Sequence, residues 1–518
     1  MKNKKGMLLV VAYIAILLLL IMLAALAIRA ISEKVITEKT RDTIKAFYIA
    51  ESGIERAMYD LKRDFIFSPG TPSWRDGRIY TSLSDPTEYI DLTQGGSITV
   101  PQDYPNSYPI PYGTASTYCP ISVSTSIGGG SFTVSMSNMP GDDNTVWISS
   151  TGTYRNISKT IRAKVIIKDI CPWNNVIFGG TGSVGEIISG NVNIHGSVII
   201  LGDSLTSSDL ALDMSGGSKI GNNYSGLDAS LQNRIPPCPT VYFNGESVES
   251  LGSELRVKRG RVGLSGTATV GDPDNPGDAY KETVGGTYVT DGFTGDQGTN
   301  NVYSDNGYSN RYDLGDSLSF PSLSDPFGGY ASYVDYAKSK ALVVSDPAVF
   351  ENITPYSSFS YSDANGSISM DGNGNMTVSG WVVIDGSNFT TMKEKALNTI
   401  TYTGKGILLV TGNININTNL VTPDVANSFP QNIIGFMTPN DINFATSQLD
   451  AMGAFYAENQ ITSEKQTTVI GGFVSNFFDM GTDVPNIYHL PLLANYLPDD
   501  FVGNDPVWFM QIVAWQEL

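Results

Sequence analysis

Cysteine and histidine are both scarce in this chain of 518 residues, which contains three cysteines and two histidines. The cysteines, Cys119, Cys171 and Cys238, are odd in number and so cannot pair completely within one chain. One disulfide beside one thiol fits this count, but the spacing does not choose the pair. His195 and His489 lie far apart and, with isolated cysteines, match no zinc-ligand spacing. The sequence therefore predicts no metal centre built from these residues.

Basic residues are few outside the N-terminal region. The chain has 32 Lys and Arg against 51 Asp and Glu, a net charge of -19. Residues 1–65 hold 11 basic and 7 acidic residues, so the remainder carries a net charge of -23. An acidic body of this kind should repel nucleic acid and anionic lipid, and we expect no nucleic-acid partner. The same charge also serves the solubility of an exposed protein.

One long segment lacks charge, glycine and proline altogether. It runs for 22 residues, from Met7 to Ile28. As a helix this segment would span about 33 Å, which is enough to cross the hydrocarbon core of a membrane. Lys2, Lys4 and Lys5 precede it, and the positive-inside rule places such an N-terminus in the cytoplasm. We therefore expect a single membrane span with the remaining chain outside the cytoplasm.

A cleaved secretory signal is the competing interpretation of this segment. The apolar part of such a signal is normally about 7–15 residues, shorter than the segment found here. A small-x-small cleavage site is nevertheless present at residues 25–27, so this alternative stays open.

The predicted helix does not stop at the membrane surface, because no proline occurs before Pro69. Apolar residues then recur at helical spacing, which predicts an amphipathic continuation to about Phe65 and a rod of about 90 Å over residues 7–65. The stripe consists of Ile44, Phe47, Ile54, Met58, Leu61 and Phe65. A membrane anchor needs only the first part of such a rod, so the stripe predicts a globular domain packed on the second part.

Residues 66–115 have little periodicity and are predicted to be loop. Short segments in which apolar and polar side chains alternate follow this region. Residues 132–136, 146–150 and 160–168 alternate apolar and polar side chains. This pattern predicts an antiparallel sheet with one buried face, within a module that spans residues 66–170.

After Cys171 the sequence consists of short apolar runs separated by glycine. Four late segments align when Thr411, Thr438, Ala457 and Ser475 are placed in register, with steps of 27, 19 and 18 residues. Such repeats predict a β-solenoid of the right-handed β-helix type over residues 171–518, with an irregular insertion at about 237–345. An ordinary β-sandwich is the alternative. The predicted fold class is therefore α+β, mostly β.

Two acidic, glycine-containing stretches suggest calcium ligands, because hard cations prefer clustered oxygens on a turn. They contain Asp363 with Asn365, and Asp371 with Asn373 and Asn375. The helix–loop–helix calcium site fails here, since loop position twelve, counted from Asp371, is a valine. Asp and Asn also form turns without any metal, and we favour that interpretation. No cofactor is therefore predicted, and calcium stays an open alternative.

Motifs for catalysis are missing from the sequence in recognisable form: a nucleophile elbow, a phosphate loop, a metal pair and paired catalytic acids. Asp385, Asp441 and Glu458 could project from successive coils, as carboxylates do in polysaccharide-cleaving solenoids. Carboxylates at coil turns are more commonly solvated, and His195 and His489 are better explained as structural residues. We therefore predict no catalytic residues and no enzymatic activity.

The N-terminal residues resemble a known family. Lys4, Lys5, Gly6 and Met7, followed directly by the apolar segment, resemble the class III leader of type IV prepilins. Residues 46–57 (AFYIAESGIERA) are similar to the second signature of PilX-like minor pilins. The resemblance covers residues 1–65 and extends more weakly to residue 170. It implies a leader of residues 1–6 that a prepilin peptidase removes between Gly6 and Met7.

One position departs from the pattern of major pilins. Their fifth mature residue is usually a glutamate, and here that position is Val11. In the family, the glutamate is thought to pair with the N-terminal amine of a neighbouring subunit in the apolar core of the filament. A subunit that lacks it would fit poorly inside the shaft, because an amine without a partner is costly to bury. The resemblance therefore implies a minor pilin at the tip or the start of a filament.

This resemblance implies partners and a location. The partners would be other minor and major pilins, bound through the N-terminal helix, together with the prepilin peptidase and the bacterial inner membrane. Before assembly the chain would cross that membrane once, and afterwards it would belong to a surface pilus or a secretion pseudopilus. Its acidic outer domain could serve adhesion, with a surface ligand or polysaccharide as a possible partner. The alternative is an anchored solenoid that binds or cleaves polysaccharide independently of any filament.

Overall fold

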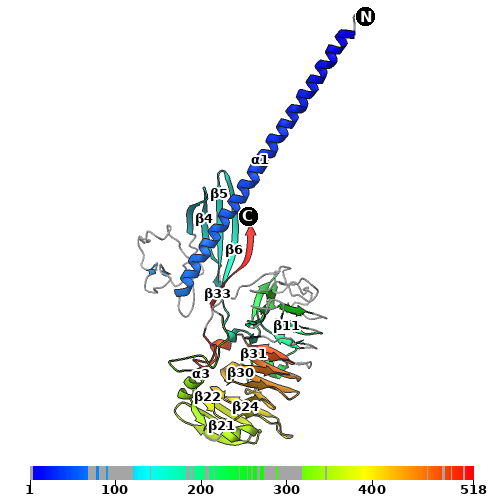
Figure 1. The fold of residues 1–518 in the computed structure, drawn as a ribbon. Coiled ribbons are helices and arrows are strands. Elements are labelled where there is room, and N and C mark those ends of the chain that lie inside the picture. The colour runs from blue at the N-terminus through cyan, green and yellow to red at the C-terminus, as the bar shows by residue number, and fades with distance from the viewer. Residues whose placement is uncertain are drawn as a thin grey trace. The chain divides into compact units, whose positions relative to one another are not determined.

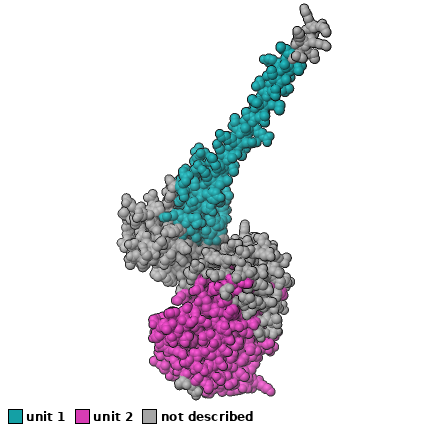
Figure 2. Space-filling model, viewed as in Figure 1, with its two compact units in different colours: residues 1–168, 508–518 teal, residues 169–507 magenta. Residues whose placement is uncertain are grey.

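A computed structural model shows the architecture of the chain. It describes residues 4–67, 78–80, 89–91, 121–139 and 142–181 and, apart from short gaps, residues 187–272, 287–289 and 318–518. The chain divides into two compact units (Figure 2). Unit 1 comprises residues 1–168 and 508–518, and unit 2 comprises residues 169–507. Each unit is described by itself below.

Unit 1 is built on one long helix, α1 (Lys4–Phe67), which continues for 64 residues (Figure 1). No side chain from Leu9 to Ile28 is buried against the described residues, and the large apolar ones are 52–74% exposed. The helix does not break after this segment, because no proline or glycine interrupts it before Gly53. The predicted continuous helix is confirmed.

The second half of α1 packs on an antiparallel sheet of five strands in the order β3-β4-β5-β6-β33. The strands are β3 (Ile121–Ile127), β4 (Gly130–Met139), β5 (Asp142–Tyr154), β6 (Ile157–Asp169) and β33 (Trp508–Glu517). A separate antiparallel pair joins β1 (Arg78–Tyr80) to β2 (Tyr89–Asp91). In β5, Val146, Ile148 and Ser150 are buried and alternate with more exposed residues. The predicted meander is therefore confirmed, while β3 and β33 were not predicted.

The helix face that meets the sheet differs from the predicted stripe. Ile54 is buried as expected, but Ile44 is 50% exposed, and the side chains of Leu61 and Phe65 lie outside the described residues. The buried face is made instead of mostly small residues: Ala46, Ile49, Ala50, Gly53, Ile54 and Ala57. Small side chains allow two backbones to approach closely. A search for large apolar residues at helical spacing does not find a face of this kind.

Unit 2 is a stack of coils whose strands pair in parallel on three faces, named A, B and C here (Figure 1). Face A contains, in spatial order, β19 (Leu342–Val344), β22 (Asn375–Ile384), β25 (Lys405–Val410), β28 (Ile433–Thr438), β30 (Leu449–Thr462), β31 (Thr467–Asp479), β7 (Ile177–Gly179), β10 (Val198–Ile200), β15 (Leu255–Val257) and β18 (Thr287–Val289). This parallel stack confirms the predicted solenoid and excludes the sandwich.

The other faces are made by the strands that follow along each coil. Face B contains β23 (Phe389–Thr390), β26 (Ile414–Asn415), β29 (Asp441–Asn443) and the ends of β30 and β31. The coils that begin at β7, β10 and β15 have a different sheet between faces A and C. It is parallel and consists of β8 (Ile187–Ile188), β11 (Leu210–Met214) and β16 (Arg261–Leu264). Face C contains the start of β22, β24 (Thr399–Thr403), β27 (Asn419–Val421), the starts of β30 and β31, β32 (Asn486–His489), β9 (Asn193–His195), β12 (Lys219–Gly221) and β17 (Thr269–Asp272).

The remaining elements decorate the coils. They are the hairpin strands β13 (Thr240–Phe243), β14 (Glu246–Glu249), β20 (Ser358–Ser362) and β21 (Gly366–Asp371), the helices α2 (Ala229–Gln232), α3 (Tyr333–Lys340) and α4 (Ser428–Gln431), and the short helices η1 (Pro172–Asn174), η2 (Pro347–Asn352) and η3 (Leu493–Asn495). Of these, β20 and β21 extend the main sheet beside β22, and the pair β13–β14 stands apart.

The order of the coils in space is not their order in the sequence. β7, the first strand of unit 2, pairs with β31, and β9 pairs with β32. The chain therefore begins in the middle of the stack, builds coils to one end, resumes at the other end with β19, and returns to the middle. As a result, the first and last coils of unit 2 are neighbours. In the sequence, β6 and β33 of unit 1 stand directly before and after the solenoid.

Aromatic and amide side chains stack from coil to coil. The rings of Phe436 and Phe455 lie 5.2 Å apart at an interplanar angle of 8°. Further contacts extend this stack to Phe389 and Phe473. On face B, Asn443 Nδ2 donates to Asn415 Oδ1 at 3.0 Å. Successive coils bury aromatic rings against one another and pair their side-chain amides by hydrogen bonds. These repeated contacts stabilise the stack.

The predicted alignment of the late repeats is confirmed at two of three steps. Thr438 pairs with Ala457, and Ala457 pairs with Ser475. The first step is wrong by one residue, because Leu409 pairs with Met437, which places Thr438 beside Val410 rather than Thr411. Every side chain of β25 from residue 407 to 410 is buried, so the strand has no alternation that could set its register.

The predicted boundaries of the outer domain also differ from the structure. Residues 237–345 are not one irregular insertion, since β15, β16 and β17 within it pair in parallel with coil strands. Residues 508–517 do not belong to the solenoid, because β33 lies beside β6 in unit 1. The backbone amide of Leu518 donates to the carbonyl oxygen of Thr160 at 2.9 Å at that edge.

The close approach of α1 to the sheet can be tested at Gly152. A Cβ atom there would collide with the carbonyl oxygen of Ala46 and the amide nitrogen of Ala50. We expect Gly152→Ala to lower the free energy of local opening of α1 by about 1–3 kcal/mol, because the helix backbone cannot yield as a side chain can. Hydrogen exchange of a peptide covering residues 42–57 measures this.

The matched control is Thr153→Ala, one residue further along β5 and on the opposite face. It should change exchange of the same peptide by less than about 0.5 kcal/mol. Equal exchange in the Gly152→Ala variant and the unmodified chain would contradict the packing described.

Candidate functional site

The first candidate site is the exposed segment of α1. It is the one described helix that is long and apolar enough to cross a membrane. Val11, the position that lacks the glutamate, is 58% exposed within it. Lys4, Lys5, Gly6 and Met7 belong to the first turns of α1, with side chains outside the described residues, and Lys2 lies outside them entirely. An apolar surface of this length must be covered by lipid or by other protein.

Polar contacts fix the packed half of α1 to the sheet. Asp42 is 6% exposed, and Arg155 Nη1, from the turn between β5 and β6, donates to its Oδ2 at 3.0 Å. Lys45 Nζ donates to the hydroxyl of Tyr154 at 3.1 Å, and this hydrogen bond lowers the pKa of Tyr154. Together with the small-residue face, these contacts hold the helix at residues 42–57. The exposed segment is thus the continuation of a helix that is itself part of the core of unit 1.

The three carboxylates considered for solenoid catalysis all have structural partners. Lys338 Nζ donates to Asp385 at 2.9 Å, and Asn459 Nδ2 donates to Asp441 at 2.6 Å. Glu458 accepts from the backbone amide of Leu323 at 2.6 Å. Each carboxylate therefore positions a neighbouring segment.

Both predicted calcium stretches form hairpin turns. Asp363 Oδ1, between β20 and β21, accepts from the amides of Asn365 and Gly366 at 2.7 and 3.0 Å. Asp371 Oδ1, at the end of β21, accepts from the amides of Asn373 and Asn375 at 2.7 and 3.1 Å. A hydrogen bond from the Asn375 side chain, together with these two amides, lowers the pKa of Asp371 to about 2. The turn donors already occupy these oxygens, as the favoured turn interpretation expects, and calcium binding stays an untested alternative.

Across the described part of the chain, no three His, Cys, Asp or Glu side chains come together in a group that could hold a metal ion. Cys171 and Cys238 are both buried, and the Sγ of Cys171 donates to the carbonyl oxygen of Gly503 at 3.2 Å. Cys119 lies outside the described residues, so the predicted pairing is untested. The two histidines are buried at the ends of neighbouring strands of face C.

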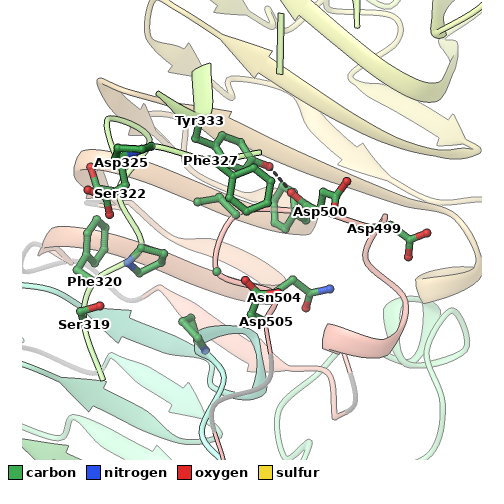
Figure 3. A pocket seen from close by; sticks show the side chains of 16 residues that line it. Ser319, Phe320, Ser322, Asp325, Phe327, Tyr333, Asp499, Asp500, Asn504 and Asp505 are labelled. Carbon is green, nitrogen blue, oxygen red and sulfur yellow. Dashed lines mark hydrogen bonds between the residues drawn. The ribbon is translucent and has the colours of Figure 1, made fainter. Parts of the chain in front are cut away.

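A second candidate site is a cavity of about 540 Å³ in unit 2 (Figure 3). It lies between the segment of residues 319–327 and the segment of residues 499–505, with Pro172 and Tyr333 also in its lining. Figure 3 shows Ser319, Phe320 and Ser322 on one side, and Asp499 on the other. Its lining comes from segments outside the coil strands and more than 170 residues apart. Sequence periodicity gave no signal for it, although residues 319–327 are rich in Ser, Pro and Phe and residues 499–505 are rich in Asp.

Comparisons with known proteins found similarity among solved structures. No family model matches the sequence, and no curated protein matches it. The chain is similar to the competence-associated pilin ComZ from Thermus thermophilus, with 18% identity and a TM-score of 0.49. The similarity covers 92% of this chain and 97% of that chain. A likeness of this degree carries no argument for function, which must come from the residues themselves.

His195 gives unit 2 a pH dependence that can be measured. Its Nδ1 donates to the carbonyl oxygen of Asn223 at 2.7 Å, its ring stacks on Tyr488 at 4.3 Å, and burial lowers its pKa from 6.5 to about 4. As the pH falls, the unfolded chain takes up this proton first, so the folded state loses stability between about pH 6.5 and pH 4. We expect a loss on the order of 3 kcal/mol, measured by urea unfolding across this range.

His195→Gln keeps a side-chain donor but cannot take up the proton, so its stability should decline less over the same window. The paired control is His489→Gln, in which the contribution of His195 should persist. Equal pH slopes for the unmodified chain and His195→Gln would show that His195 is not buried as a neutral ring.

Proposed function

We propose that this chain is a minor-pilin-like subunit that joins a type IV pilus or a related secretion pseudopilus through its N-terminal helix. One observation carries the proposal: a single unbroken helix has an entirely exposed apolar first half and a second half that belongs to the core of unit 1. A span on a separate linker would serve as an anchor equally well. A span rigidly continuous with the folded domain can also place that domain in a fixed position on a bundle of such helices.

In this proposal the leader of residues 1–6 stays in the cytoplasm and a peptidase cuts between Gly6 and Met7. The exposed segment is first covered by the lipid of the inner membrane and then by the helices of other pilins. This exchange is favourable for an apolar helix when packing replaces lipid contacts. The chain acts as a structural and binding subunit, without enzymatic activity.

Val11 supports a position at the end of the filament rather than within its shaft. With valine at the fifth mature position, this chain offers no carboxylate to the charged N-terminal amine of a neighbouring pilin. Burying a charge without a partner is costly, so such a subunit is best placed where no subunit follows it. The bulk of unit 2, residues 169–507, favours the same position.

The proposal predicts the mass of the mature protein. Protein extracted from the membrane should lack residues 1–6 and begin at Met7, as read by intact mass spectrometry. Gly6→Val should leave the leader attached, because a branched side chain replaces the glycine before the cut. Loss of surface filaments in cells that carry only this variant is the expected consequence.

Ala27→Val is the matched control, because it alters the competing small-x-small site of a secretory signal. It should leave the mass of the processed protein unchanged apart from the substitution. A mature chain that begins after residue 27, or processing blocked by Ala27→Val and not by Gly6→Val, would refute the proposal.

A further inference from the structure

We propose that the cavity between residues 319–327 and 499–505 binds a neutral saccharide. This inference concerns unit 2 alone and does not depend on filament assembly. The cavity volume, about 540 Å³, falls within the range of about 300–1,000 Å³ that is usual for small-molecule sites. The solenoid does not need these segments to stack its coils, since they lie outside its coil strands.

The first wall of the cavity is fixed to the coil beneath it. Glu458, at the face-A end of β30, accepts hydrogen bonds from the hydroxyl of Ser322 and the amide of Leu323. The hydroxyl of Tyr456 donates to the carbonyl oxygen of Pro321. The ring of Phe320 stacks on Tyr456 at 5.8 Å. These contacts set the position of the wall before any ligand arrives.

The second wall is fixed in a similar way. The hydroxyl of Tyr333 donates to the carbonyl oxygen of Asp500, and the hydroxyl of Tyr336 donates to its carboxylate. That hydrogen bond, together with burial, raises the pKa of Tyr336 to about 12. Trp173 Nε1 donates to the carbonyl oxygen of Val502 at 2.7 Å. A preformed site of this kind avoids much of the entropy lost when loops become ordered on binding.

The lining combines aromatic rings with carboxylates and lacks positive charge. Phe320 and Phe327 are half-buried, which leaves part of each ring available to a ligand. Asp325, Asp499 and Asp505 are exposed around the opening. None of the sixteen described lining residues is Lys, Arg or His. Phosphates, uronic acids and nucleic acids are therefore disfavoured, because nothing in the lining compensates their charge.

The arrangement of the carboxylates favours hydroxyl groups over a metal ion. A hard cation needs several oxygens converging on one point, and the described acidic side chains form no such group. Carboxylates distributed around a cavity can instead accept hydrogen bonds from separate hydroxyl groups of one ligand. Aromatic rings offer flat apolar surface to the C–H faces of a sugar. A neutral saccharide unites these features in one ligand class.

The test uses the full chain in a detergent without a sugar headgroup. The probes are neutral gluco-, manno- and galacto-oligosaccharides, with oligogalacturonate, calcium chloride and choline chloride as charged comparisons, measured by isothermal titration calorimetry. We expect at least one neutral probe to bind with Kd of about 1 mM or tighter. Phe320→Ala and Asp505→Asn should each weaken that binding by about tenfold or more.

Two substitutions elsewhere in unit 2 serve as controls. Tyr356→Ala removes a ring that is 52% exposed, and Glu394→Gln neutralises an exposed carboxylate. Both should leave Kd within about twofold of the unmodified chain. Asp505→Asn conserves shape at an exposed position, so its result does not depend on packing, and unchanged thermal unfolding verifies the fold of Phe320→Ala.

Three results would overturn the proposal. The first is no binding of any neutral probe at about 10 mM. The second is binding of calcium, choline or oligogalacturonate alone, which would assign the cavity to a charged ligand. The third is neutral-probe binding that the two cavity variants leave unchanged, which would place the saccharide site elsewhere.

Discussion

The close contact between the second half of α1 and strands β4 and β5 is the constraint on which the rest of unit 1 depends. Gly53 and Gly152 lie where the helix and sheet are too close for a Cβ atom without a shift. Ala46, Ala50 and Ala57 are buried on the same face of α1, which therefore consists mostly of small side chains. Because the helix is fixed there and has no break, its apolar first half must extend beyond the domain. The geometry that buries one half of the helix thus exposes the other, and only lipid or other helices can cover it.

A second constraint acts in unit 2, where the solenoid begins and ends in the middle of its own stack. The pairings of β7 with β31 and of β9 with β32 make the first and last coils neighbours. A domain with adjacent ends can be inserted between two strands of another domain with little disturbance. Trp173 and Phe501, from the segments that enter and leave the stack, pack at 4.9 Å. These entering and leaving segments also supply Pro172 and residues 499–505 to the cavity proposed to hold a saccharide, and residues 319–327 supply its other wall.

The sequence predicted the features that periodicity and composition control. The long helix, the meander and the parallel coils were all foreseen, because each has a repeating apolar pattern. The apolar pattern gave wrong predictions where every residue of a strand is buried and where small residues form the buried face of a helix. The buried run at residues 407–410 could not set its register, and the helix face built from alanine and glycine was mistaken for one built from Ile44 and larger residues. The role of β33 and the cavity depend on residues distant in sequence, such as Asp500 and Tyr333, and the pattern of a single sequence does not connect such residues.

The central claim is that other helices cover the exposed first half of α1 in the working assembly. A photo-crosslinking amino acid at Leu18, which is 57% exposed in the middle of that segment, tests it directly in cells. The account predicts protein adducts whose partner peptides come from the N-terminal helices of other pilins, while the same probe at Tyr356 of unit 2 gives none of these adducts. Crosslinking at Leu18 to lipid alone would contradict the account.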